Sequence, residues 1–342
     1  IKTRKECLIM RYTQTTDVKT GNVLARTIYG SDGRILIKAN TVITPFLIQR
    51  LNMLGYPGVY LFDPGETDSV LKLALNERVR IRASAHLRNI DLDKCIYIAN
   101  EIVREVIDTK DTAAEVSRIS GYDTCTWVHS VDVCTYSVMV GVAMGYGDKE
   151  LKELSQASLL HDMGKTMVNL SVLNKPGKLT DDEFCMIKNH PLYGWDLLRK
   201  NTILPSSVCA AVYEHHENED GSGYPRGVEG SRIHKYAKII HATDVYEACT
   251  ALRPYKKPMN PSDALENLLS GYGKVFDSRV IDVMRSIIVL YPVGRQVLLS
   301  DGRVGTVAEN RRELLSRPIV KMDDGTCVDL MDVLDLTILK MI

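Results

Sequence analysis

Histidine and acidic residues with the chemistry of metal ligands gather in the middle of this chain. His161 and Asp162 are adjacent, and so are His215 and His216. Neutral imidazole and carboxylate together are the usual ligand set for first-row metals such as iron, manganese and zinc. A carboxylate beside a histidine at a helix end can bridge two ions, and bridged metal pairs are common in phosphoester hydrolysis. The two pairs therefore favour a metal site.

Other residues of the same chemistry lie on neighbouring predicted helices. They are His129, His190 and Asp244. A single helical histidine, such as His86 or His234, is more often a surface residue or a core residue with a hydrogen-bond partner. Two adjacent pairs within one helical region are harder to explain in that way.

The elements that must position these residues run with helical periodicity over about residues 69–290. Apolar residues recur at i, i+3, i+4 and i+7, as at Ala99, Ile102, Val103 and Val106. Thr180 and Glu183 form a capping-box pattern at the start of another helix. Residues 128–144 have an apolar pattern that also fits a strand, but their length favours a buried central helix.

The two ends of the chain have different patterns. Strands are expected at residues 23–29, 34–37, 59–62, 297–299, 303–307, 319–322 and 327–330. Thr44 fits the N-cap of a short helix that ends before Gly55. Asp301-Gly302 and Asp324-Gly325 are hairpin signals. We therefore predict a mainly α fold, with a helical domain at 66–290, a small α+β accessory unit at 1–65 and a small β-rich unit at 291–342.

Composition limits the ligand and the compartment. The 342 residues include 43 basic and 43 acidic ones, so the formal net charge is zero, which argues against polymeric nucleic acid but allows a small anionic substrate. The eight cysteines are scattered without a CxxC pair, as in a reducing compartment. No apolar stretch reaches the ~18 residues of a membrane span. Because no signal-peptide pattern follows Ile1, we expect a trimmed start and a cytoplasmic location.

The motifs around the predicted ligands resemble those of one family. Residues 161–165, HDMGK, are similar to the HD-x-G-K signature of HD-domain phosphohydrolases. Residues 215–225, HHENEDGSGYP, resemble the string that names the HD-GYP subfamily. Three further segments, 175–177, 180–183 and 253–256, also resemble that family. The resemblance covers about residues 122–256 and implies a helical HD-type domain.

The resemblance also implies a set of metal ligands. They are His129, His161, Asp162, His190, His215, His216 and Asp244. Asp162 is expected to bridge two divalent transition metal ions, iron or manganese, with a hydroxide between them that attacks phosphorus and expels a ribose oxygen. Lys165 is expected to stabilise the developing charge or to protonate the leaving oxygen. Asp162 and Lys165 are therefore the predicted catalytic residues.

Substrate contacts are implied by the same family pattern. Arg253 and Lys256 resemble its phosphate-contacting basic pair, and a solvated charge cluster at a helix end is the alternative. Tyr224 is expected on one wall of the cleft, where Gly223 shapes the loop or serves only as a turn residue. Glu247 stands where the family commonly has aspartate, and its longer side chain is expected to alter substrate contacts.

One further departure concerns the number of metals. Some family members have a glutamate four residues before the first ligand histidine, where it helps to hold a third metal. Here that position is Cys125. A thiolate is also a metal ligand, but a small core residue is the expected role, so we predict two metals.

These features predict a metal-dependent phosphodiesterase that opens a cyclic dinucleotide, with cyclic di-GMP as first candidate. The sequence leaves open whether the product is the linear dinucleotide or GMP. Two alternatives stay open: an HD phosphohydrolase for another nucleotide, such as cyclic GMP-AMP, and a catalytically weak sensor or scaffold. Degenerate members typically lack ligands or the lysine, whereas this chain keeps all seven ligands and Lys165. We also expect a homodimer, and signalling partners that bind through the GYP loop at residues 223–225.

Overall fold

The computed structural model describes most of the chain, and the structural statements below refer to that part. It comprises residues 10–29, 34–56, 58–62, 75–109, 125–173, 175, 177–201, 203–251, 259–311 and 314–342. The predicted substrate contacts Arg253 and Lys256 lie outside these ranges, as does the turn expected at residues 31–33.

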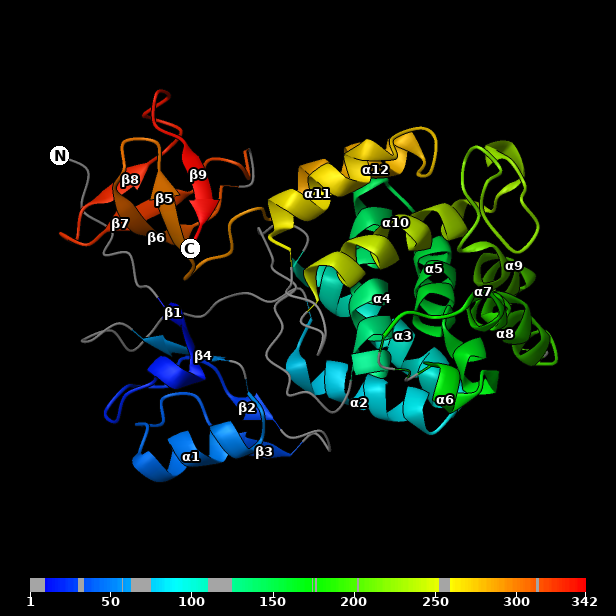
Figure 1. The fold of residues 1–342 in the computed structure, drawn as a ribbon, viewed down its shortest axis with the longest axis horizontal. Helices are drawn as coiled ribbons and strands as arrows, with labels where there is room; N and C mark the ends of the chain where they lie inside the picture. The colour runs from blue at the N-terminus through cyan, green and yellow to red at the C-terminus, as the bar shows by residue number, and fades with distance from the viewer. Residues whose placement is uncertain are drawn as a thin grey trace.

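The middle of the chain folds into a bundle of helices, so the fold is mainly α, as predicted (Figure 1). Its α-helices are α2 (Glu77–Arg88), α3 (Leu92–Thr109), α4 (Cys125–Ala143), α5 (Asp148–Leu160), α6 (Leu170–Leu173), α7 (Asp181–Lys188), α8 (His190–Leu198), α9 (Ser206–Glu214), α10 (Lys235–Thr250), α11 (Pro261–Ser270) and α12 (Ser278–Ile287). Two short 3-10 turns, η3 (Met163–Met167) and η4 (Gly230–Arg232), lie between them. Buried apolar residues from Leu75 to Ile288 form one shared core.

Helix α4 is the central helix of this bundle and packs against α2, α3, α5, α10 and α12. Val131 and Val138 on it are fully buried, which confirms the helix predicted over residues 128–144. Arg80 of α2 pairs with Asp132 of α4 at 2.7 Å, and both side chains are buried. Helices before the motif region are thus tied to the helix that carries the first predicted ligand, His129.

The N-terminal unit is a small α+β structure with its own apolar core. Its elements are β1 (Met10–Gln14), η1 (Thr15–Asp17), β2 (Ile28–Tyr29), β3 (Ile35–Ile37), α1 (Pro45–Met53) and β4 (Gly58–Phe62). Thr44 caps α1 by accepting a hydrogen bond from the Leu47 N–H, as predicted. The strand expected over residues 23–29 is shorter, because Val23 and Leu24 form only isolated bridges. Strand β1 was not predicted; it pairs antiparallel with β4.

The C-terminal unit is a five-stranded antiparallel sheet with strand order β8-β7-β6-β5-β9. The strands are β5 (Gln296–Leu299), β6 (Val304–Glu309), β7 (Ile319–Met322), β8 (Cys327–Asp329) and β9 (Ile338–Met341). Both predicted hairpins form, and Gly302 and Gly325 take the positive φ that such turns require. Strand β9 was not predicted; it closes the sheet against β5.

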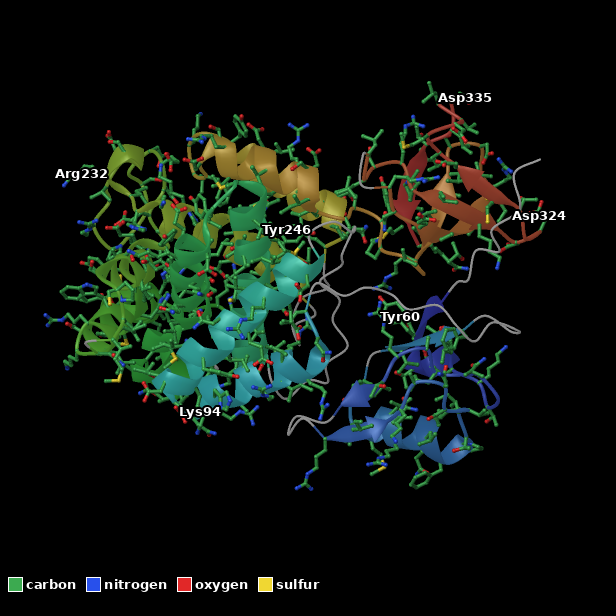
Figure 2. All side chains as sticks on the ribbon, turned by 180° about the vertical axis from the view of Figure 1, so that it is seen from behind. Tyr60, Lys94, Arg232, Tyr246, Asp324 and Asp335 are labelled. Carbon is green, nitrogen blue, oxygen red and sulfur yellow. The ribbon has the colours of Figure 1, made fainter. Side chains whose placement is uncertain are left out.

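The described elements form three groups: the N-terminal unit, the helical bundle and the β-rich C-terminal unit. Figure 2 shows Tyr60 in the N-terminal unit, Tyr246 in the helical bundle and Asp324 on the β-rich unit. Each group encloses its own buried apolar cluster. In the described part of the chain, no helix combines the length and the apolar character that crossing a bilayer requires.

Candidate metal centre

The seven predicted ligands meet in one group of side chains, called here the ligand cluster. It comprises His129 on α4, His161 at the end of α5, Asp162 before η3, His190 at the start of α8, His215 and His216 after α9, and Asp244 on α10. Most of these side chains come from helix ends. Helices that are distant in the sequence thereby present ligand atoms to one place.

The first part of the cluster is formed by His129, His161 and Asp162, whose ligand atoms lie within 4.8 Å of one another. The Nε2 atoms of His161 and His129 lie 3.4 and 3.7 Å from Asp162 Oδ2. Asp244 extends this group, because its Oδ1 lies 3.0 Å from His129 Nε2. Two imidazoles and two carboxylates thus lie close together in this part of the cluster.

The second part is formed by His190, His215 and His216, whose ligand atoms also lie within 4.8 Å of one another. The Nε2 atoms of His190 and His215 are 3.2 Å apart. Asp162 joins the two parts, because its second oxygen, Oδ1, lies 3.3 Å from His190 Nε2. The two oxygens of this carboxylate therefore face different groups of imidazoles.

Three histidines of the cluster are oriented by the same backbone contact. In each, Nδ1 bonds to the carbonyl oxygen three residues earlier: His161 to Ser158 at 2.8 Å, His190 to Ile187 at 2.7 Å and His215 to Val212 at 2.7 Å. A carbonyl accepts only a proton donor, so these contacts assign the proton to Nδ1. Each Nε2 then keeps its lone pair for a metal.

His129 is oriented by a carboxylate instead. Its Nδ1 hydrogen-bonds to Glu247, whose side chain is only 1% exposed. Glu247 is predicted to contact the substrate, whereas the structure places it behind the predicted ligand His129. Asp244 and Glu247 are three residues apart on α10, and this spacing places both on the helix face that meets His129. A carboxylate in this position fixes the imidazole and raises its basicity.

Burial and neighbouring charges favour the metal-binding protonation states of His215, His216, Asp162 and Asp244. At His161, burial lowers the pKa but the Asp162 carboxylate outweighs it and raises the pKa. Desolvation lowers the pKa of His215 and His216 well below the ordinary value, so both imidazoles are neutral. Burial opposes ionisation of Asp162, but the Lys165 ammonium and His161 outweigh it and hold the pKa of Asp162 well below its usual range. The hydrogen bond from His129 does the same for the pKa of Asp244, again against burial. Neutral imidazoles and ionised carboxylates are the ligand forms of these side chains.

Two buried atoms of the cluster lack a hydrogen-bond partner within the described residues. They are His161 Nε2 and Asp162 Oδ1. An unsatisfied buried polar atom costs about 1–3 kcal/mol, so its presence in a native site calls for a ligand or another explanation. A divalent cation coordinated by both atoms would satisfy them, and imidazole and carboxylate are suitable donors. The residues present therefore fit a metal.

A glycine allows the two halves of the cluster to approach. A Cβ on Gly164 would lie 1.9 Å from the His190 carbonyl oxygen and 2.5 Å from the Gly194 nitrogen. Any larger residue would push η3 away from α8. Gly164, the glycine of the HDMGK motif, thus lets η3 and α8 approach closely, and this approach places Asp162 beside His190.

The predicted catalytic lysine and the predicted wall residue both contact the cluster. Lys165 Nζ lies 2.6 Å from Asp162 Oδ2, and its side chain is 25% exposed. The Tyr224 ring stacks on His216, with 4.7 Å between the centroids and 28° between the planes. Burial raises the pKa of Tyr224, and the nearby carboxylates of Asp244 and Asp162 raise it further.

The loop that carries the tyrosine is held by the glutamate of the HHENEDGSGYP segment. Glu217 is buried and accepts hydrogen bonds from the backbone N–H groups of Arg226 at 2.7 Å and Val228 at 3.1 Å. A Cβ on Gly223 would lie 2.3 Å from the Asn218 nitrogen. Gly223 is not among the glycines with positive φ. Its role is therefore to let two backbone segments approach closely.

Sequence reasoning missed one basic residue beside the cluster. Lys188 ends α7, and its Nζ lies 5.3 Å from the centroid of the Tyr224 ring. The only signal was its position two residues before His190, which by itself does not place a side chain. Cys125 is the first residue of α4, but its side chain is not among those that the structure describes.

Known proteins resemble this chain in sequence. The HD domain family matches residues 109–280. A cyclic di-GMP phosphodiesterase of Pseudomonas aeruginosa is 35% identical over 233 residues, which cover 68% of this chain and 56% of that protein. The 3'3'-cGAMP-specific phosphodiesterase 2 of Vibrio cholerae is 28% identical over 242 residues, which cover 67% and 45%. The chain thus spans about half the length of these curated relatives.

The fold also occurs in a solved structure. An HDG"Y"P protein from Bdellovibrio bacteriovorus aligns over 81% of this chain and 99% of that chain, with a TM-score of 0.54 and 14% identity. The match to the family and the 35% identical relative show that the chain belongs to the HD domain family. Within that family it is a member of the HD-GYP group, as its motifs indicate. An HD domain implies divalent metal binding, and the ligand cluster supplies the donors.

Proposed function

We propose that this protein is a metal-dependent phosphodiesterase that hydrolyses a cyclic dinucleotide, with cyclic di-GMP as the first candidate. The observation that carries the proposal is the position of Asp162, whose two oxygens face two groups of buried imidazoles. A carboxylate in this position suits two metal ions side by side, an arrangement common in phosphodiester hydrolysis. The relatives named as cyclic di-GMP and 3'3'-cGAMP phosphodiesterases support the substrate class.

Two divalent ions, iron or manganese, are the proposed cofactors. One would be held by His129, His161, Asp162 and Asp244, and the other by Asp162, His190, His215 and His216. Imidazole and carboxylate ligands accept either metal. When bound, such ions lower the pKa of a coordinated water and offset the charge of the attacked phosphate.

Lys165 is the proposed proton donor. Hydrolysis adds water across one P–O bond, so that phosphorus keeps the new oxygen as a phosphomonoester and the departing ribose oxygen takes up a proton. The Lys165 ammonium, 2.6 Å from Asp162, would lie close to a phosphate held by metal ions at the ligand cluster. It would stabilise the developing charge or protonate the leaving oxygen. Tyr224 is proposed as a wall of the substrate site, and Arg253 and Lys256 as phosphate contacts.

The test is turnover of cyclic di-GMP and of cyclic GMP-AMP by anaerobically purified protein loaded with iron or manganese. Asp162→Ala should lower turnover about a thousandfold, because loss of the metals removes about 4 kcal/mol of transition-state stabilisation. Asp301→Ala, on a hairpin of the β-rich unit, is the matched control. If metal-loaded protein bound a cyclic dinucleotide without hydrolysing it, the protein would be a sensor and not an enzyme. If it bound neither cyclic di-GMP nor cyclic GMP-AMP, the proposed substrate class would be wrong.

We also propose that the chain has three units with boundaries near residues 65 and 290. The buried apolar clusters support this division, because each lies within one of the three units. The flanking units contain none of the seven ligands and are proposed as accessory modules.

Three further proposals come from the sequence: a homodimer, partner binding through residues 223–225, and a cytoplasmic location. Size-exclusion chromatography with light scattering would test the dimer.

A further inference from the structure

A basic residue lies at the junction between α7 and α8, beside the ligand cluster. Lys188 is the last residue of α7, and His190 is the first of α8. The Lys188 ammonium lies 4.8 Å from the centroid of the Phe184 ring and 5.3 Å from that of Tyr224. Its side chain is half-buried. We call Phe184, Lys188 and Tyr224 the rim.

The rim is in direct contact with the cluster through its tyrosine. Tyr224 stacks on the predicted ligand His216 and also faces the Lys188 ammonium. Phe184, the second ring in contact with this lysine, leaves 47% of its surface exposed. A molecule bound at the cluster that extended past Tyr224 would therefore meet a cation and an exposed aromatic ring.

Several lysines of the helical bundle pair with carboxylates. Lys165 pairs with Asp162 at 2.6 Å, Lys175 with Glu183 at 2.7 Å and Lys238 with Glu219 at 2.9 Å. Among the described residues, the contacts of Lys188 are with aromatic rings alone. A cation–π contact at a partly exposed site contributes about 0.5–1 kcal/mol, whereas a charge-assisted hydrogen bond to phosphate is stronger. The ammonium is thus oriented but remains available to an anion.

The proposed substrate requires such a group. A cyclic dinucleotide contains two phosphodiesters, and only one of them reacts at a time. The second phosphate keeps its negative charge in the bound state and needs a cation, because burying an unpaired charge is costly. Lys165 pairs with Asp162 at the reacting centre, and Arg253 and Lys256, also proposed as phosphate contacts, lie outside the described residues. Lys188 is therefore proposed in addition to that pair.

We propose that Lys188 binds the phosphate of the cyclic dinucleotide that is not being cleaved, with Phe184 as a surface on which a base stacks. This inference rests on the proposed function and adds a substrate-binding residue to it. Base stacking on an aromatic side chain contributes about 1–3 kcal/mol and tolerates different bases. The rim would therefore contribute to affinity for cyclic dinucleotides in general, and not to the choice between guanine and adenine.

The test compares three variants with the wild-type protein. Lys188→Gln removes the charge, Lys188→Arg keeps it, and Lys149→Gln is the matched control because that side chain is 90% exposed on α5. Binding of a non-hydrolysable phosphorothioate analogue of cyclic di-GMP to the metal-loaded protein is measured by equilibrium dialysis, so that hydrolysis does not interfere. KM and kcat are then measured on the metal-loaded protein, and bound metal is quantified by elemental analysis.

Lys188→Gln should raise Kd and KM about tenfold, as expected for the loss of one charge-assisted hydrogen bond. It should leave kcat and metal content near the wild-type values, and Lys188→Arg should restore most of the affinity.

Unchanged Kd and KM in Lys188→Gln, with a wild-type protein that binds and hydrolyses cyclic di-GMP, would overturn the inference while the proposed function stands. Reduced metal content in Lys188→Gln would also overturn it, because the residue would then act through the cluster. A metal-loaded wild-type protein that neither binds nor hydrolyses cyclic dinucleotides would overturn the proposed function itself.

Discussion

The ligand cluster and the rim are adjacent, yet they are held in different ways. In the cluster, the imidazoles of His161, His190 and His215 are buried and each is anchored to a backbone carbonyl. In the rim, Lys188 and Phe184 are partly exposed and touch each other through a cation–π contact. The first arrangement sets ligand positions before any ligand binds. The second leaves side chains free to adjust, so we expect metal binding to depend on the cluster and substrate affinity on the rim.

The largest effect should come from removing a cluster ligand. His190→Ala deletes an Nε2 that faces both His215 and Asp162. Turnover of a cyclic dinucleotide should fall about a thousandfold, equal to about 4 kcal/mol, because one metal loses a ligand. Rates and bound metal are measured together. His86→Ala, at an isolated histidine on α2, is the control, and a similar loss there would remove the distinction between cluster and surface histidines.

A second variant tests the carboxylate behind His129. Glu247→Gln keeps the size of the side chain but removes the charge next to Nδ1. Loss of such a partner typically lowers metal affinity 10–100-fold, so about that decrease is expected in competition with a chelator. Glu266→Gln on α11 is the matched control. If Glu247→Gln kept its metal affinity and raised KM instead, the residue would belong with the substrate contacts that the sequence analysis assigned to it.

A third variant tests how closely η3 and α8 must approach. Gly164→Ala would place a Cβ 1.9 Å from the His190 carbonyl oxygen. We expect the free energy of unfolding to fall by about 1–3 kcal/mol, as for other overpacked sites. Thermal unfolding measures the change. Gly147→Ala is the control, because the nearest atom to its Cβ is a flexible carboxylate oxygen at 3.8 Å; equal melting temperatures for the two variants would contradict the steric argument.

The smallest effect is expected at the rim. Phe184→Leu removes an exposed aromatic face but keeps an apolar side chain, so KM should rise about threefold, within the lower range for base stacking. Metal content and melting temperature should not change, because Phe184 is 47% exposed. Phe46→Leu on α1, where the ring is 68% exposed, is the control. A loss of metal from Phe184→Leu would show that rim and cluster are not separate.

Local sequence patterns were sufficient to predict much of the fold. The cap at Thr44, the capping box of Thr180 with Glu183 and the Asp-Gly hairpins all form as predicted. These features depend on residues a few positions apart, so a short window contains all the interacting groups. Strands β1 and β9 escaped prediction because each is stabilised by pairing with a distant strand and lacks a clear pattern of its own.

The sequence by itself determined which residue types were available for the cluster. The motifs named all seven members, and the tertiary structure brings them together. Only the tertiary structure decided how each side chain is used. Glu247 contacts His129 across a separation of 118 residues, and Lys188 meets Tyr224 through the packing of α7 beside the GYP loop. Such contacts arise from the packing of helices against one another, and no local pattern specifies them.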